Sequence, residues 1–271
     1  FIVPALINIV VSANAGGAFS PFGDITTLMV WQRGFVSFFD FFNIFLPSVV
    51  NYVIPAAIIY FAIPNEVPKG DGKKVIVQPG GNVIAILGIL TISITVAGHQ
   101  VLHMPPVFGM MFGLGMLGTY GYFLKTRYPG KNKFDIFELT GKAEWDTLLF
   151  FYGILVCVGG LAAVGYLKLI SDDMYVTLGA TYANILVGFL SAIIDNIPIV
   201  YAVLTAHPSM DMGQWLLITL TAGVGGSLLS IGSAAGVALM GQARGVYTFF
   251  AHLRWSWAIL IGYAASVACH L

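Results

Sequence analysis

The stretch SANAGGAFSPFGDITT, residues 12–27, interrupts an otherwise apolar run with two adjacent glycines, a proline and a carboxylate. Glycine and proline weaken a helix, whereas Asp is a common residue at a helix start. The stretch therefore predicts a broken helix. A short apolar run over residues 1–12 leads into a polar interruption from Ser12 to Asp24, and a second short run ends near Arg33.

A second interrupted segment, residues 214–243, repeats this pattern 209 positions later. In each copy Gly-Gly is followed by five residues, another glycine and a polar residue, which is Asp24 in the first copy and Ser233 in the second. Five identities support the alignment: Ile9, Ala13, Gly16, Gly17 and Gly23 fall on Ile218, Ala222, Gly225, Gly226 and Gly232. The chain thus contains an internal repeat of broken helices.

The composition is that of a membrane protein. Hydrophobic residues make up 58% of the 271 positions, charged residues make up only 9%, and the mean hydropathy is +0.88. Soluble domains carry about 25% charged residues. A formal net charge of zero argues against nucleic-acid binding. Several apolar runs reach the roughly 20 residues that a helix needs to cross a bilayer, so we expect an all-α polytopic membrane protein.

The sequence points to no resident cofactor. Cys157 and Cys269 lie in separate apolar runs, which fits small buried side chains better than a disulfide or a ligand pair. His99 and His103 are four residues apart but flank a proline-containing loop. This position fits interfacial histidines better than metal or haem ligands.

Apolar runs bounded by charged or Pro/Gly-rich segments divide the chain into three parts. Residues 1–33 hold the first broken helix. Residues 34–145 hold two basic loops, the second with an interfacial helix, and three spans, at 35–63, 82–98 and 104–124. Residues 146–271 hold the second repeat, which comprises a span at 146–167, a segment at 175–206, the broken helix at 214–243 and a final span at 255–270.

The segment 175–206 is interrupted by Asp195-Asn196-Ile197-Pro198 and is either one long helix or a re-entrant hairpin with this turn at its tip. If both basic loops are cytoplasmic, a hairpin leaves ten Lys and Arg residues inside and two outside, whereas a single helix leaves eight and four. Cytoplasmic loops are enriched in Lys and Arg, so the hairpin is favoured. The two broken helices then run in opposite directions, which is typical of inverted-repeat transporters.

The repeat also predicts a segment upstream of this chain. The hairpin tip precedes Gly226 by about 30 residues, and the same offset in the first copy falls before Phe1. We therefore expect the chain to be N-terminally truncated and to lack a comparable first hairpin.

Three carboxylates interrupt the apolar runs: Asp24, Asp40 and Asp195. Asp24 and Asp195 lie in predicted breaks, where non-helical backbone must face protein or a watery cavity. An unpaired carboxylate is costly in a membrane. A carboxylate that binds either a proton or a metal ion is the minimum device for cation/proton exchange. The alternative is that Asp24 and Asp195 only cap short helices, while Asp40 fits an interfacial position equally well.

Three stretches resemble one known family. Residues 12–27 are similar to the first broken-helix signature of the NhaD-type sodium/proton antiporters, members of the ion transporter superfamily. Residues 191–198, SAIIDNIP, resemble the second hairpin tip of that family, and residues 225–236 resemble its second broken helix. The resemblance implies a sodium or lithium site built from both repeats, at Asn14, Asp24, Thr26, Thr27, Ser191, Asn196, Ser230 and Ser233. Among these we expect the Na⁺ ligands to be Asn14, Asp24, Asn196, Ser230 and Ser233, and its place in the break adds Asp195 to the site.

We therefore expect a secondary transporter, not an enzyme, that exchanges Na⁺ or Li⁺ for H⁺ across a bacterial inner membrane. Its partners are small cations and the lipid bilayer, and a homodimer is compatible with the sequence. An anion carrier of the same superfamily, for dicarboxylate or arsenite, is the nearest alternative. Two more distant alternatives are a structural respiratory subunit and an intramembrane aspartyl protease, although Phe22-Gly23-Asp24 lacks the Gly-x-Gly-Asp pattern of the latter.

Overall fold

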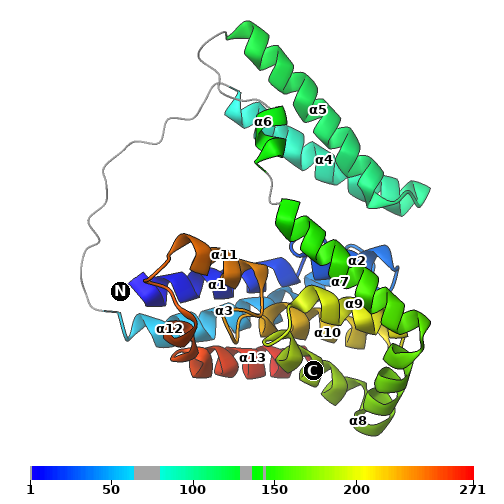
Figure 1. The fold of residues 1–271 in the computed structure, drawn as a ribbon, viewed down its shortest axis with the longest axis vertical. Coiled ribbons are helices and arrows are strands. Elements are labelled where there is room, and N and C mark those ends of the chain that lie inside the picture. The colour runs from blue at the N-terminus through cyan, green and yellow to red at the C-terminus, as the bar shows by residue number, and fades with distance from the viewer. Residues whose placement is uncertain (1, 64–79, 129–135, 143–144) are drawn as a thin grey trace. The chain divides into compact units, whose positions relative to one another are not determined.

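The computed structural model describes residues 2–63, 80–128, 136–142 and 145–271, and every regular element in these ranges is a helix (Figure 1). Four of the described helical segments are long and apolar enough to cross a membrane: α3 with the 3-10 turn before it (Asp40–Tyr60), α4 (Gly81–Leu102), α5 (Pro106–Arg127) and α8 (Tyr166–Ser191). The predicted all-α polytopic membrane protein is confirmed.

Shorter helices complete the described part of the chain. They are α1 (Ile2–Ala18), α2 (Ile25–Gln32), α6 (Ile136–Gly141), α7 (Trp145–Ala163), α9 (Asn196–Ala206), α10 (Met212–Gly225), α11 (Ala234–Gln242), α12 (Phe249–Leu253) and α13 (Ser256–His270). Of the residues proposed for the interfacial helix in the second basic loop, those before Ile136 lie outside the described ranges. The chain divides into two compact units, residues 1–66 with 149–271, and residues 67–148.

The smaller unit is built on a hairpin of α4 and α5. A Cβ atom at Gly109 or Gly113 would overlap the side chain of Thr95 or Thr91, so glycine is required for the two helices to lie this close. The hydroxyls of Thr91 and Thr95 donate to carbonyls of their own helix, at 2.7 Å in both cases. The hairpin therefore packs tightly without leaving these polar atoms unpaired.

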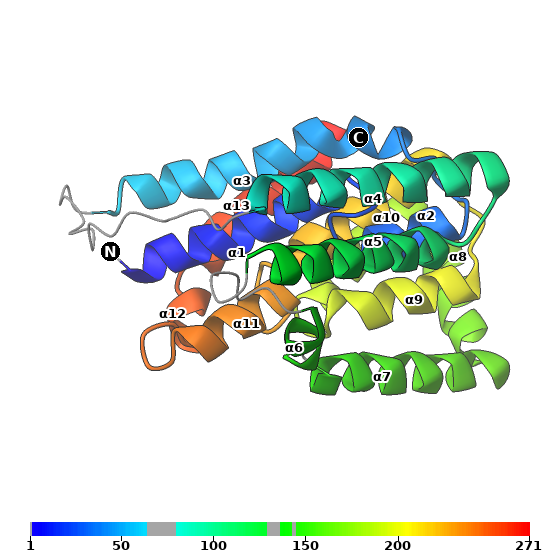
Figure 2. The same cartoon turned by 90° about the horizontal axis from the view of Figure 1, so that it is seen from above.

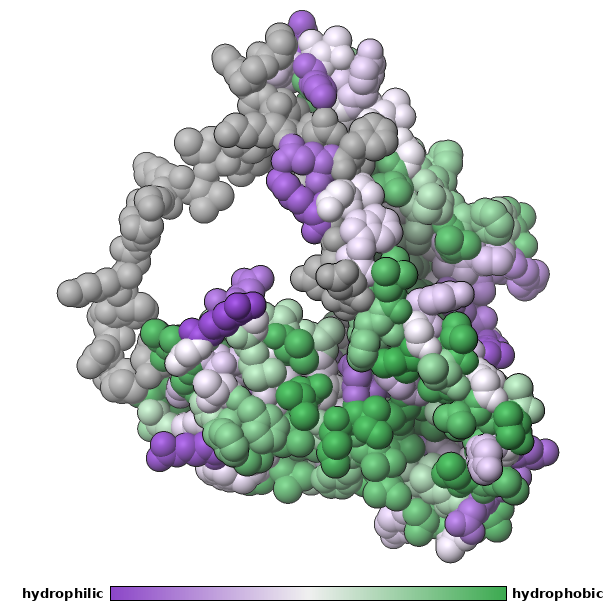
Figure 3. All heavy atoms as spheres, viewed as in Figure 1, coloured by the Kyte–Doolittle hydropathy of each residue, from purple (hydrophilic) through white to green (hydrophobic). Residues whose placement is uncertain are grey.

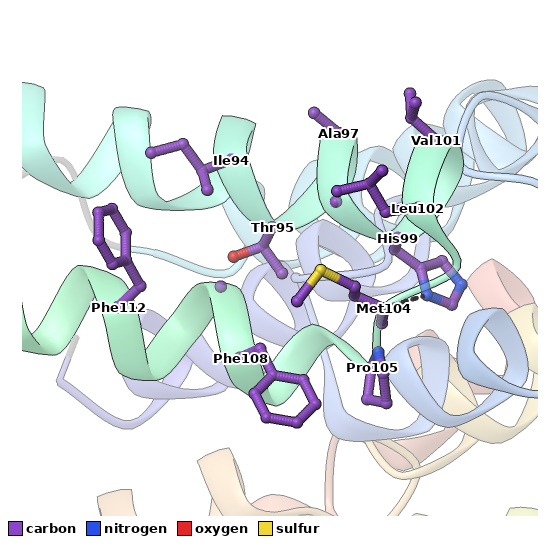
Figure 4. Close-up of a pocket in the computed structure, with 12 residues that line it drawn as sticks. Ile94, Thr95, Ala97, His99, Val101, Leu102, Met104, Pro105, Phe108 and Phe112 are labelled. Carbon is purple, nitrogen blue, oxygen red and sulfur yellow. Dashed lines mark hydrogen bonds between the residues drawn. The ribbon is translucent and has the colours of Figure 1, made fainter.

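An apolar cavity of about 670 Å³ lies at the turn of this hairpin (Figure 4). His99, which borders it, places Nδ1 3.1 Å from the carbonyl oxygen of Met104, while His103 ends α4 in the left-handed conformation. Figure 4 shows mainly aliphatic and aromatic side chains such as Ile94, Phe108 and Phe112 around the cavity.

In the larger unit α10 forms the centre. Residues 215–225 of this helix are all buried, and α10 contacts α1, α2, α8, α9 and α13. The surface that Figure 3 shows for this unit is largely apolar, and large side chains such as Val176, Tyr182 and Phe250 are at least 70% exposed. An apolar exterior around a packed interior is expected where lipid surrounds the protein.

The two broken helices have the same local geometry. A Cβ atom added to Gly17 would lie 2.9 Å from the carbonyl oxygen of Gly23, and one added to Gly226 would lie 2.6 Å from that of Gly232. Each break is followed by a helix whose N-cap residue is extended, Asp24 before α2 and Ser233 before α11. In Figures 1 and 2, α1 and α2 run in one direction and α10 and α11 run in the opposite one. This arrangement supports the predicted inverted repeat.

The predicted start of the first interruption was wrong. Residues 12–18 remain helical, and the break covers only residues 19–24. Gly17 lies inside the helix, and its lack of a Cβ atom lets α1 approach the backbone of Gly23. The helix therefore carries Asn14 on a rigid turn instead of on a loop.

The segment 175–206 is divided at residues 192–195, and the two parts, the end of α8 and α9, contact each other. The helical stretch α8 begins at Tyr166, directly after Gly165 in the left-handed conformation. It is interrupted at Gly179, whose backbone is not helical, so two helices meet there. Asp172 and Asp173 lie on the exposed side of this helix, so hydropathy alone did not reveal its first turns. Re-entry of this hairpin into the membrane stays a prediction.

The close approach of Gly17 to Gly23 predicts a sharp difference between neighbouring glycines. Gly23→Ala should lower the free energy of unfolding by about 1–3 kcal/mol, because its Cβ would overlap backbone atoms that cannot rotate away. Gly16→Ala is the matched control, since nothing lies within 4 Å of its Cβ position. Thermal unfolding of the purified protein in detergent measures both variants. Equal stability of the two would contradict the close packing of the break.

Candidate ion-binding site

A small cavity of about 200 Å³ lies where the N-terminal ends of α2, α9 and α11 meet. Its polar lining consists of one side chain from each of four segments: Asn14 on α1, Asp24 before α2, Asn196 at the start of α9, and Ser233 before α11. The sequence predicted all four as site residues. The two repeats and the hairpin therefore contribute to one cavity.

Asp24 is the one carboxylate in the described lining and is held by three donors. The amide of Ile25 donates to Oδ1 at 2.6 Å, while the hydroxyl of Thr26 and Nδ2 of Asn196 donate to Oδ2 at 3.1 and 2.8 Å. Thr27 accepts from the Asp24 amide at 3.2 Å, which completes a reciprocal cap. The partial positive charge of a helix N-terminus favours an anionic group here.

Asn14 joins the first repeat to the second. Its Nδ2 donates to the hydroxyls of Ser227 and Ser233, at 2.8 and 2.9 Å. Because both amide hydrogens are used in this way, the side-chain oxygen of Asn14 is the atom left available as an acceptor or cation ligand. Ser233 also caps α11, since its hydroxyl accepts from the amide of Gly236 at 3.3 Å. The contact couples the start of α11 to α1.

Five other predicted residues lie outside the cavity lining. Ser191 donates its hydroxyl to the carbonyl of Ala222 at 2.6 Å and so ties the end of α8 to α10. Ser230 is fully buried, and its hydroxyl has no hydrogen-bond partner among the described residues. Both carboxylate oxygens of Asp195 are likewise buried without a partner in the described ranges. Thr26 and Thr27 are also buried and reach the cavity only through Asp24.

Ser227 is the site partner that the sequence-based set omitted. It follows Gly226 directly, in the second break, and is a buried polar residue among apolar ones. That position was the available signal, but the contact with Asn14 depends on how α1 packs against the second repeat. Phe151 of α7 also lines the cavity, and nothing in its apolar surroundings distinguishes it in the sequence.

The chain is similar to known transporters. The sequence profile of the citrate transporter family, CitMHS, matches residues 2–223. The Na⁺/H⁺ antiporter NhaD of Alkalimonas amylolytica is 54% identical over the whole chain, which covers 61% of that protein. The same antiporter of Vibrio parahaemolyticus is 53% identical over 97% of the chain and 69% of its own length, and sodium/proton antiporter 1 of Arabidopsis thaliana is 34% identical over 97% of the chain. The chain spans about three fifths of the length of the Alkalimonas protein and of two further bacterial NhaD proteins, from Vibrio cholerae and Halomonas elongata.

The contact between Asn14 and Ser233 predicts energetic coupling across the two repeats. Asn14→Ala and Ser233→Ala should each lower stability, and the double variant should lose less than the sum, with a coupling free energy of about 1 kcal/mol. Unfolding of the purified protein measures this cycle. Asn14→Ala combined with Ser266→Ala, whose hydroxyl bonds within α13, should be additive. Additivity in the first pair as well would refute the coupling.

Proposed function

Because the chain belongs to the citrate transporter family and within it to the NhaD-type antiporters, we propose that it exchanges Na⁺ or Li⁺ for H⁺ across a membrane. The family is one of transporters and not of enzymes. Since the chain covers only part of its relatives, the proposed activity is that of the full-length protein. The observation that carries it is Asp24, a carboxylate in a small cavity shared by both repeats.

The lining of the cavity suits a small hard cation. Such ions bind carboxylate, amide and hydroxyl oxygens, and Asp24, Asn14, Asn196 and Ser233 supply these three kinds of oxygen. A volume of about 200 Å³ has room for a cation with several waters. We assign these four residues as the ligands, with Asp24 as the charged one.

Exchange follows from competition for the oxygens of Asp24. In the structure Oδ2 accepts from both Thr26 and Asn196, so a proton or a cation arriving at this atom must displace one of the two donors. Asn196 can instead rotate its amide and offer its oxygen to the cation. The occupant of Asp24 thereby sets the contact between α2 and the tip that joins α8 to α9.

Asp195 and Ser230 extend this proposal. Their buried oxygens have no partner among the described residues, and an unpaired polar group is costly in a membrane protein. We assign both residues to the ion-binding region, as the sequence predicts. Ser191 supports the site through its bond to the carbonyl of Ala222.

Anion transport is the second candidate. Three helix N-termini point towards the cavity, and their partial positive charges favour an anion such as a dicarboxylate. Asp24 opposes this, because its negative charge lies in the same cavity and would repel the anion. Cation exchange uses both the carboxylate and the neutral oxygens and is the better account.

The location follows from the relatives. The NhaD proteins that match the chain come from bacteria, which supports a multi-pass position in the bacterial inner membrane. A homodimer is compatible with the exposed apolar side chains of α4 and α5, such as Ile89 and Phe112. Cross-linking of the protein in native membranes distinguishes a dimer from a monomer.

Asp24→Asn should abolish Na⁺-driven pH change while the protein stays folded. Asn is as good an N-cap as Asp, so α2 keeps its start and only the exchangeable charge is lost. A pH-sensitive dye in everted vesicles measures the exchange, and we expect a loss of at least about tenfold. Asp40→Asn, which removes an equal charge outside the cavity lining, is the matched control. Exchange at the wild-type rate in Asp24→Asn would contradict the proposed function.

Competition at Asp24 also predicts a pH dependence. If one proton and one Na⁺ bind at the same carboxylate, protons compete with Na⁺ more strongly as the pH falls. The apparent KM for Na⁺ should then rise by about tenfold for each unit by which the pH is lowered, once protons fill the site. Initial rates at several Na⁺ concentrations between pH 6 and pH 9, about the range in which vesicle assays work, measure this change. If KM for Na⁺ stayed constant as the pH was lowered and only the maximal rate fell, protons would bind elsewhere.

A further inference from the structure

A buried histidine next to the second break takes no part in the cavity lining. His252 of α12 is fully buried, and its Nε2 lies 2.8 Å from the carbonyl oxygen of Ser227. Its Nδ1 lies 2.6 Å from the hydroxyl of Tyr247, which is also buried. The three residues form a chain of contacts that leads from α12 to the break.

The contacts determine which ring nitrogen carries the hydrogen when the imidazole is neutral. A carbonyl oxygen can only accept, so Nε2 of His252 must carry a hydrogen and donate to Ser227. Nδ1 is then an acceptor in the neutral ring, and the hydroxyl of Tyr247 donates to it. Both ring nitrogens are satisfied, and Tyr247 holds the ring in the orientation that reaches the break.

A second donor, Ser256 at the start of α13, also binds the second break. Ser256 donates its hydroxyl to the carbonyl of Leu228 at 2.6 Å. His252 and Ser256 thus bind two consecutive carbonyls that the break has freed, and this restrains both peptide planes. The equivalent positions in the first copy are Asn43 and Pro47, so the pair is particular to the second repeat.

The restrained peptide carries a residue that contacts the ion site. Ser227 accepts from Nδ2 of Asn14 through its hydroxyl and from His252 through its carbonyl. A shift of this peptide would release one amide hydrogen of Asn14 and change the orientation of this side chain in the cavity lining. We propose that His252, oriented by Tyr247, is a positioning residue that holds Ser227 and, through it, the Asn14 ligand of the cation.

This inference rests on the proposed cation exchange, and the test separates the two. In everted vesicles containing the full-length protein, His252→Leu should raise the KM for Na⁺ by about tenfold while the maximal rate changes little, as for loss of an outer partner of a metal ligand. His252→Gln keeps a donor near the position of Nε2 and should restore most of the affinity. Tyr247→Phe should give an intermediate KM.

His270→Leu is the matched control, because His270 also directs Nε2 to a backbone carbonyl, that of Gly213 at 3.0 Å, but at an exposed end of α13. Its KM should equal that of the wild type. An unchanged KM in His252→Leu and His252→Gln, with only less folded protein, would overturn the positioning role. Absence of Na⁺-driven exchange in the wild type would instead overturn the proposed function itself.

Discussion

A helix that is interrupted in apolar surroundings leaves peptide groups that must all find hydrogen-bond partners inside the protein, and this requirement shapes the larger unit. At the helix starts after the two breaks, Asp24 and Ser233 accept from backbone amides. At the freed carbonyls of the second break, His252 and Ser256 donate. Glycine pairs allow the two sides of each break to lie against each other. The breaks are therefore stable features of the fold and not irregularities in it.

The side chains that cap the broken helices also face the cavity, and this joins structure to function. Asp24 caps α2 and receives a donor from Asn196 at the hairpin tip. Ser233 caps α11 and receives one from Asn14. An occupant that changes the hydrogen bonds of Asp24 must therefore change contacts between helices of different repeats. Such linkage between ligand and helix contacts is what an alternating-access transporter requires.

The sequence predicted the two breaks, the division of residues 175–206 and the four polar residues of the cavity, because local patterns of glycine, proline and isolated polar residues mark them. It misjudged Ser12 to Ala18, since a helix packed closely against another backbone also needs glycine. The sequence could not distinguish Ser191, whose hydroxyl donates to a backbone carbonyl, from the residues that line the cavity. His252 lies between two apolar segments, and only the packing of α12 against the second break gives it a role. Contacts between distant segments have no local signal.

In the proposed exchange, a proton and a cation compete for one carboxylate between the repeats. Titration calorimetry of Na⁺ into the purified full-length protein, repeated in buffers with different ionisation enthalpies, gives the number of protons released for each Na⁺ bound. We expect a release of about one proton at a pH where the site is protonated, falling towards zero at higher pH. Na⁺ binding that releases no proton at any pH would contradict it.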